Sequence, residues 1–291
     1  MKKKKEATKF DLLALSEYEK IADVSYVQVS DGCEIRILKS SVGSKETKPF
    51  TLVLVAGWAT IVLGWDEVLM EAKNHFDIVY IETREKGTSK VTKDSRFDTQ
   101  RFTLDIKEIF EYLKLDQNKV VVLSSSFSSM LVAYMLSHKM ISPLLCVFIG
   151  PIERIPLPRS LKILLTIFPK WLYLIVKPLG IFWVKHFKAE DEEHAAKYTR
   201  AINEADPLKW KKTSKHFFNE LFWDAYAGFD NQVLVVDESK DKMHDTEMTH
   251  KINEIIKNSI FLDLKTNKNT HSKPIVDTIL DHLQKAGVKG V

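Results

Sequence analysis

The chain has 291 residues, of which 45% are hydrophobic and 28% charged, and this is the composition of a folded protein rather than a disordered one. Its formal net charge of +4 is small, and the run Lys2 to Lys5 near the N-terminus supplies positive charge in a solvated tail. Nucleic-acid binding needs basic residues gathered on one folded face, and the sequence has no such concentration.

The N-terminal segment and the cysteines indicate where the protein works. The lysine run leads into Glu6-Ala7-Thr8-Lys9 without an apolar stretch, which predicts no signal peptide and a cytoplasmic location. Cys33 and Cys146 fall in separate strand-like segments and not at metal-ligand spacing, so we expect two buried, reduced thiols.

Strand-like and helix-like patterns alternate through the first half of the chain. The expected strands are 24–30 and 33–38, which flank the turn dipeptide Asp31-Gly32, then 50–55, 76–81, 120–123 and 144–149. One expected helix follows residue 62, and two more cover 103–115 and 128–137. This alternation predicts an α/β fold with a mostly parallel central sheet and helices on both faces.

From Pro151 the alternation stops, and helix-like segments follow without a clear strand. It resumes with a strand at 232–236, a helix near 249–256, a strand at 260–264 and a helix at 274–285. We therefore predict a basic N-terminal tail over 1–20, a first part of the core over 21–150, a helical cap or lid over 151–228 and a second part of the core over 229–291.

Five serines follow the apolar run at 120–123 and lead directly into a helix-like pattern, which is the sequence of a sharp strand-to-helix turn. At such a turn the residues two before and two after the nucleophile meet neighbouring backbone and must be small. Only Ser126 meets this condition, because Ser124 and Ser128 occupy those two positions. Ser126 is the predicted nucleophile.

A serine hydroxyl becomes a good nucleophile when a histidine takes its proton and a carboxylate orients that histidine. His271 lies in a polar loop after the last expected strand, at the sheet edge where strand C-termini converge, and we predict it to be the base. The segment 237–241 offers three acids between the serine and the histidine. We predict Asp241 as the carboxylate and hold Asp237 as the reserve.

In its order Ser126, Asp241, His271 the sequence resembles the α/β-hydrolase fold superfamily, in particular its cap-bearing esterases, lipases and monoacylglycerol-lipase-like enzymes. The resemblance extends to two further motifs. Where the family has His-Gly-x, the chain has Ala56-Gly57-Trp58. The segment Glu82-Thr83-Arg84-Glu85-Lys86-Gly87-Thr88-Ser89 is similar to the family's Asp-x-Arg-Gly-x-Gly-x-Ser signature. The chain departs from the family in the elbow Ser124-Ser125-Ser126-Phe127-Ser128, which replaces Gly-x-Ser-x-Gly, in Ala56 for a histidine and in Glu85 for a glycine.

The resemblance implies an oxyanion hole made by the backbone N–H groups of Trp58 and Phe127. It implies no metal or organic cofactor. Arg84 is expected to anchor its loop rather than to act in catalysis.

Residues 155–187 are rich in large apolar side chains, but Lys162, Lys170, Lys177, Lys185, Pro169 and Pro178 interrupt them. The segment is therefore expected to form short helices and not a transmembrane span. One interpretation is a cap that only packs on the sheet. The other is a hydrophobic cap in which Trp171, Phe182 and Trp183 line an acyl pocket, and which contacts a membrane surface.

These patterns predict a serine hydrolase that cleaves carboxylic esters with hydrophobic acyl chains through an acyl-enzyme intermediate. The expected partner is a lipophilic small-molecule ester, with peripheral membrane contact through the cap and no nucleic acid. Two alternatives stay open. One is a thioesterase, acyltransferase or amidase with the same triad, and the other is a non-catalytic binding protein of the same fold.

Overall fold

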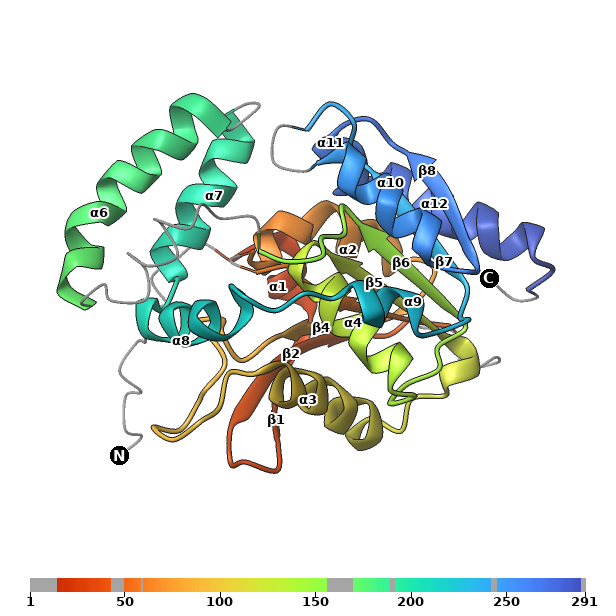
Figure 1. The fold of residues 1–291 in the computed structure, drawn as a ribbon, viewed down its shortest axis with the longest axis horizontal. Helices are drawn as coiled ribbons and strands as arrows, with labels where there is room; N and C mark the ends of the chain where they lie inside the picture. Colours follow the sequence, from red (N-terminus) through yellow and green to blue (C-terminus); the bar gives the residue numbers. More distant parts are fainter. Residues whose placement is uncertain are drawn as a thin grey trace.

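The computed structural model describes residues 15–42, 50–58, 60–155, 170–188, 192–241 and 245–288. An eight-stranded sheet runs through the molecule with helices on both of its faces (Figure 1). The strands are β1 (Asp23–Gln28), β2 (Glu34–Ser40), β3 (Thr51–Val55), β4 (Asp77–Glu82), β5 (Val120–Ser125), β6 (Leu145–Ile149), β7 (Val233–Asp237) and β8 (Ser259–Asp263).

The strand order across the sheet is β1-β2-β4-β3-β5-β6-β7-β8. The β1–β2 and β2–β4 pairs are antiparallel, and every pair from β4 to β8 is parallel. Because β5 lies in the middle, the residue that follows it stands at the centre of the sheet's carboxyl edge. In open α/β sheets ligands bind outside this edge.

The two faces of the sheet have separate apolar cores, because successive residues of a strand point to opposite sides. Val120 and Val122 pack with helices α3 (Thr99–Tyr112), α4 (Phe127–Ser137), α9 (Trp223–Ala227) and α10 (Thr246–Ile255). Val121 and Leu123 pack with α1 (Glu17–Ile21), α2 (Asp66–Ala72) and α12 (Lys273–Lys285). Burial on both faces explains why the central strands are almost wholly apolar in sequence.

The remaining helices are η1 (Val62–Trp65), η2 (Gln117–Lys119), α6 (Lys170–Trp183), the π-helical turn η3 (Val184–Lys188), α7 (Glu192–Glu204), α8 (Pro207–Phe217) and α11 (Asn267–Thr270). Helices α6 to α9 lie between β6 and β7, and in the described part of this segment no strand occurs. Helices α6 and α7 stand to one side of the sheet (Figure 1). None of the helices in the described ranges is both long enough and apolar enough to cross a bilayer.

The predicted α/β class with a mostly parallel sheet is confirmed, and the structure differs from the prediction at several element boundaries. Helix α1 lies partly within the expected tail 1–20 and its Tyr18 is fully buried, so the packed part of the chain begins before residue 21. Helix α3 begins at Thr99, because the Asp98 side chain accepts a hydrogen bond from the N–H of Arg101 and caps the helix there. Helix α11 was not predicted. Part of the expected cap, residues 156–169 and 189–191, lies outside the described residues.

Candidate active site

Ser126 stands at the corner where β5 turns into α4, and its backbone is strained. Its φ is +49° and its ψ is −113°, a conformation that residues other than glycine rarely adopt. Such a conformation costs about 1–3 kcal/mol and persists only where surrounding contacts hold it. Here the N–H of Ser126 donates to the carbonyl of Ile149 at the end of β6, at 2.9 Å.

The other four serines of the cluster are buried, and most of their hydroxyls take part in hydrogen bonds within the fold. The hydroxyl of Ser128 donates to the carbonyl of Val55 at 2.5 Å and accepts from the N–H of Ser125 at 3.0 Å. Ser124 Oγ lies 3.2 Å from Ser129 Oγ. These hydrogen bonds give the hydroxyls of Ser124 and Ser128 a partner at the two positions where the family has glycine. Ser126 alone in the cluster is partly exposed, and no described residue makes a hydrogen bond with its hydroxyl.

The loop after β3 lies directly against this corner. A Cβ atom on Gly57 would come within 3.0 Å of both the carbonyl oxygen and the hydroxyl of Ser125, so only glycine fits without movement. Within the described ranges, the N–H groups of Trp58 and Phe127 donate to no acceptor. Both predicted oxyanion donors therefore have no acceptor among the described residues.

The carbonyl of Gly57 is held from the opposite side by Lys86 and Thr60. It accepts hydrogen bonds from Lys86 Nζ at 2.5 Å, from Thr60 Oγ1 at 2.8 Å and from Thr60 N–H at 3.3 Å. The sequence does not distinguish Lys86 from other lysines, because a lysine in a charged loop is most often solvated, and only the burial of Lys86 in the structure marks it.

His271 follows α11 directly, and its ring packs on Trp65, with 4.2 Å between ring centroids. Its Nδ1 lies 3.0 Å from the carbonyl oxygen of Asn267 and 2.9 Å from the hydroxyl of Thr270. A carbonyl can only accept, so the proton of the neutral ring belongs on Nδ1. Nε2 then carries the lone pair that a general base needs.

The carboxylate beside His271 is Glu238, whose Oε1 lies 3.5 Å from Nδ1. Glu238 is 1% exposed, and the same oxygen accepts hydrogen bonds from the hydroxyl of Thr270 and from Nδ2 of Asn267 at 3.2 Å.

Asp237, the reserve prediction, is the last residue of β7 and is fully buried. For Asp241, which is 9% exposed, the N–H donates to the carbonyl of Glu238 at 2.7 Å, so both residues belong to one turn. The role predicted for Asp241 stays a prediction.

Among the described residues, no hydrogen bond joins Ser126 to His271. Catalytic hydrogen bonds in ligand-free enzymes are often long and tighten only when substrate is bound. The two residues come from the two strand ends that the sequence indicated.

Arg84 has the structural role that was expected of it. Its guanidinium is fully buried and makes two hydrogen bonds of 2.6 Å to Asp105, one of 2.9 Å to Asp31 and one of 2.6 Å to the carbonyl of Arg96. It ties the loop after β4 to α3 and to the β1–β2 turn.

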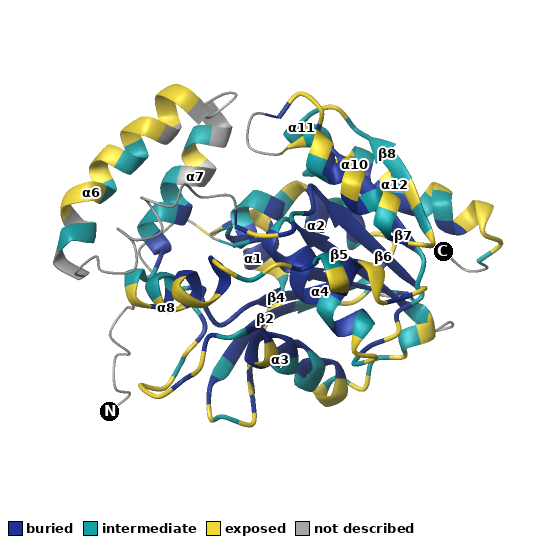
Figure 2. Ribbon diagram, in the orientation of Figure 1, coloured by how far each residue is buried: buried dark blue, intermediate teal, exposed yellow. Residues whose placement is uncertain are grey.

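Two of the predicted pocket residues face solvent. Phe182 is 56% exposed and Trp183 is 49% exposed, and much of α6 is coloured as exposed in Figure 2. A pocket-lining role needs side chains turned inward, so in this conformation they do not have the orientation that the prediction required. Trp171 lies in α6, and its side chain is outside what the structure describes.

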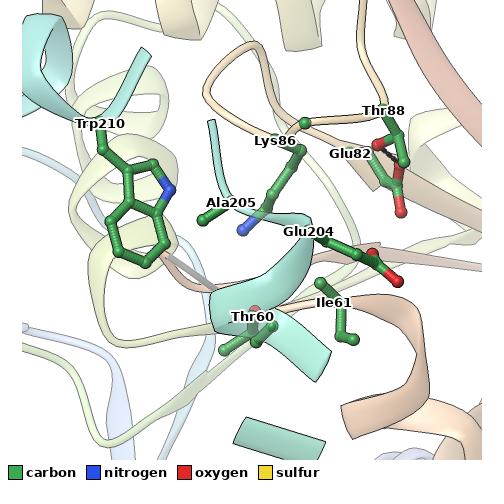
Figure 3. A pocket seen from close by; sticks show the side chains of 10 residues that line it. Thr60, Ile61, Glu82, Lys86, Thr88, Glu204, Ala205 and Trp210 are labelled. Atoms are coloured by element: carbon green, nitrogen blue, oxygen red, sulfur yellow. Dashed lines mark hydrogen bonds between the residues drawn. The ribbon is translucent and has the colours of Figure 1, made fainter. Parts of the chain in front are cut away.

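A small cavity lies behind the Gly57 loop (Figure 3). Its walls include Thr60, Glu82, Lys86, Glu204 and Trp210, and only about 10 Å³ of it admits the centre of a water molecule. Trp210 of α8 also packs on Trp58, with 5.5 Å between ring centroids. The cavity is too small for an ester substrate.

Comparison with known proteins gives the fold. No family model and no curated protein matches the sequence. Among similar solved structures are the enol-lactonase from Burkholderia xenovorans LB400 (TM-score 0.71, 14% identity, 89% of this chain and 99% of that one), a thermophilic esterase from Thermogutta terrifontis (0.71, 16%, 91% and 99%) and a bromoperoxidase from Bacillus anthracis (0.71, 16%, 90% and 99%). The likeness to these structures and the eight-stranded, mostly parallel sheet show that the chain has the α/β-hydrolase fold.

Proposed function

We propose that the protein is a serine hydrolase that cleaves carboxylic esters through an acyl-enzyme intermediate. The observation that carries this proposal is the conformation of Ser126. It is a non-glycine residue with φ of +49° at a strand-to-helix corner, it is partly exposed, and its hydroxyl has no hydrogen-bond partner among the described residues. These are the features of a nucleophile elbow.

In the proposed reaction Ser126 Oγ attacks the ester carbonyl while Nε2 of His271 takes the hydroxyl proton. The negative charge that forms on the carbonyl oxygen is stabilised by the N–H groups of Phe127 and Trp58. Collapse of this intermediate expels the alcohol, which leaves with the proton from His271. A water molecule then attacks the acyl-enzyme, with His271 again as base, and releases the acid and free Ser126.

We propose Glu238 as the carboxylate that orients His271 and stabilises its charged form. Support comes from the 3.5 Å separation of its Oε1 from Nδ1 and from its hydrogen bonds with Thr270 and Asn267, which fix the carboxylate in place. Asp241 is the competing candidate and is tested beside it.

The proposed substrates are esters with hydrophobic acyl chains, and the proposed partner of α6 is an anionic lipid surface. Six large apolar side chains of this helix and η3 are each 40–65% exposed: Ile175, Val176, Leu179, Phe182, Trp183 and Phe187. Lysines 177 and 185 lie among them in sequence. An amphipathic helix with large apolar residues and lysines is typical of peripheral lipid binding.

The ester proposal is tested by hydrolysis of p-nitrophenyl acetate, butyrate and octanoate, with matched thioester and amide substrates. We expect ester turnover that rises with chain length, that is lost in Ser126→Ala and that persists in Ser125→Ala, which removes the neighbouring hydroxyl. Turnover of the thioester or amide alone would contradict the ester assignment. Equal turnover in Ser126→Ala would contradict the nucleophile.

The lipid proposal is tested by co-sedimentation with vesicles of phosphatidylglycerol and of phosphatidylcholine. We expect binding to the anionic vesicles that falls about tenfold or more in Leu179→Asp, because a charge at the apolar face opposes burial in lipid. Tyr112→Asp serves as the control, since Tyr112 is 66% exposed on α3. Equal binding by Leu179→Asp and the native chain would exclude α6 as the lipid-binding face.

A further inference from the structure

Three hydrogen-bond donors converge on one carbonyl oxygen beside the candidate active site. Gly57 accepts from the Lys86 ammonium at 2.5 Å and from the Thr60 hydroxyl and N–H at 2.8 and 3.3 Å. Lys86 is 5% exposed, which is rare for a lysine and means that its hydration has been exchanged for these contacts. Figure 3 shows its side chain extending from its loop toward the segment that carries Thr60.

The carbonyl of Gly57 and the N–H of Trp58 belong to the same peptide unit. A trans peptide is planar, and its C=O and N–H bonds point in opposite directions. Donors that fix the carbonyl on one side therefore fix the direction of the Trp58 N–H on the other. A cation on the carbonyl also polarises the peptide and makes its N–H a stronger donor.

Lys86 is itself held by a second layer of contacts. Its Nζ lies 3.0 Å from Oε1 of Glu85, which is fully buried. Its own carbonyl accepts a hydrogen bond of 2.6 Å from Nζ of Lys209 in α8, a lysine that is 7% exposed. The ammonium is thus kept at the loop by charge and by the fixed backbone of its own residue.

We propose that Lys86 is a positioning residue for the oxyanion hole, one that acts through the Gly57–Trp58 peptide and not by touching substrate. The inference rests on the proposed function, because it assigns the Trp58 N–H to the oxyanion of the ester reaction. The peptide has to keep its N–H toward a charge that exists only in the transition state, and Lys86 keeps it there.

The rival explanation is that Lys86 only neutralises Glu85. Three variants separate the two roles: Lys86→Met, Glu85→Gln and the double variant Glu85→Gln/Lys86→Met. If Lys86 served Glu85 alone, the double variant would regain native turnover, because no buried charge is left unpaired. If Lys86 acts through Gly57, turnover stays low in the double variant, and in Glu85→Gln it falls less than in Lys86→Met, because the hydrogen bond from Lys86 to Gly57 remains.

The main readout is the division of the loss between kcat and KM. Removal of one oxyanion donor typically lowers kcat by about 10²–10³, and we expect a smaller but clear loss of about tenfold in Lys86→Met, with KM changed less than twofold. The Ki of phenylboronic acid, which forms a tetrahedral serine adduct, should rise by the same factor as kcat falls. The Ki of a planar product carboxylate should not change. Thr60→Val, which removes a second donor to Gly57, should act in the same direction.

Native kcat in Lys86→Met, or recovery in the double variant, would overturn the positioning role and leave the proposed function intact. A native chain that neither hydrolyses esters nor reacts with a fluorophosphonate would overturn the proposed function itself. Circular dichroism and thermal unfolding of each variant show that the compared proteins are folded.

Discussion

The imidazole of His271 lies against the indole of Trp65, with ring centroids 4.2 Å apart and ring planes 33° from parallel. Trp65 is fully buried at the end of η1, so it offers a rigid surface to the histidine. The contact holds the ring with Nδ1 toward Asn267, Thr270 and Glu238. A histidine fixed in this way has its other nitrogen available as a base.

The first prediction concerns the carboxylate beside that ring. Glu238→Gln should lower kcat by at least about 100-fold, because it removes the charge that orients and stabilises the imidazolium. Asp241→Asn is the matched variant and should lower kcat by less than about fivefold. The measurement is kcat for p-nitrophenyl butyrate in both variants. The reverse order of effects would return the role to Asp241.

The strand-to-helix corner could be predicted from sequence because its signal is local. An apolar run that enters a serine cluster and a helix pattern without Gly or Pro determines the fold of that segment, and the small-neighbour condition then selects Ser126. The identity of the acid could not be predicted in the same way. Glu238, Ser239 and Asp241 share one turn, and the residue that meets His271 depends on α11 and on Trp65, which is about 200 residues away in sequence.

The orientation of α6 was also beyond the sequence. An apolar helix with regularly spaced lysines is compatible with an inward pocket wall and with an outward apolar face. Periodicity defines the apolar face of a helix but not what that face contacts. In the structure Phe182 and Trp183 are about half exposed. Likewise, nothing in the sequence around Lys86 distinguishes a buried lysine from a solvated one.

The second prediction concerns the close contact at Gly57. Gly57→Ala should lower kcat by about tenfold or more, because a Cβ within 3.0 Å of the Ser125 carbonyl must displace the loop that carries Trp58. Gly64→Ala is the control, since a Cβ there meets no atom within 4 Å. Steady-state kinetics of both variants provide the check. A fully active Gly57→Ala would mean that the loop can move without cost.

The third prediction concerns alkaline pH and Tyr18. Burial raises the pKa of Tyr18 to about 12, and the hydrogen bond with Ser40 only partly opposes this. The unfolded chain loses this proton near pH 10, as an ordinary tyrosine does. Stability from this group is therefore complete below about pH 10 and is lost as the pH rises toward 12.

Tyr18→Phe should accordingly flatten the fall of unfolding free energy between pH 10 and 12, by about 2 kcal/mol over that interval. Urea unfolding at several pH values measures it. Part of the slope should remain, because burial also raises the pKa of Tyr80 and Tyr226. Parallel curves for the native chain and Tyr18→Phe would contradict the assignment.

The fourth prediction concerns the buried Arg84. Arg84→Gln should lower the free energy of unfolding by about 3 kcal/mol, because it removes the bidentate hydrogen bonds to the buried Asp105, which keeps Arg101 as its ionic partner. Arg96→Gln, which removes an arginine that is 64% exposed, should change it by less than about 1 kcal/mol. Chemical denaturation measures both. Similar losses in the two variants would show that burial of Arg84 adds nothing.

The central claim is that Ser126 is a nucleophile, and its most direct test is covalent labelling. The native protein is treated with a fluorophosphonate and analysed by intact mass and peptide mapping, beside Ser126→Ala and Ser125→Ala. We predict one phosphonyl group per chain, located on Ser126, with none in Ser126→Ala and normal labelling in Ser125→Ala. Labelling that persists in Ser126→Ala, or a native chain that does not react, would contradict the account.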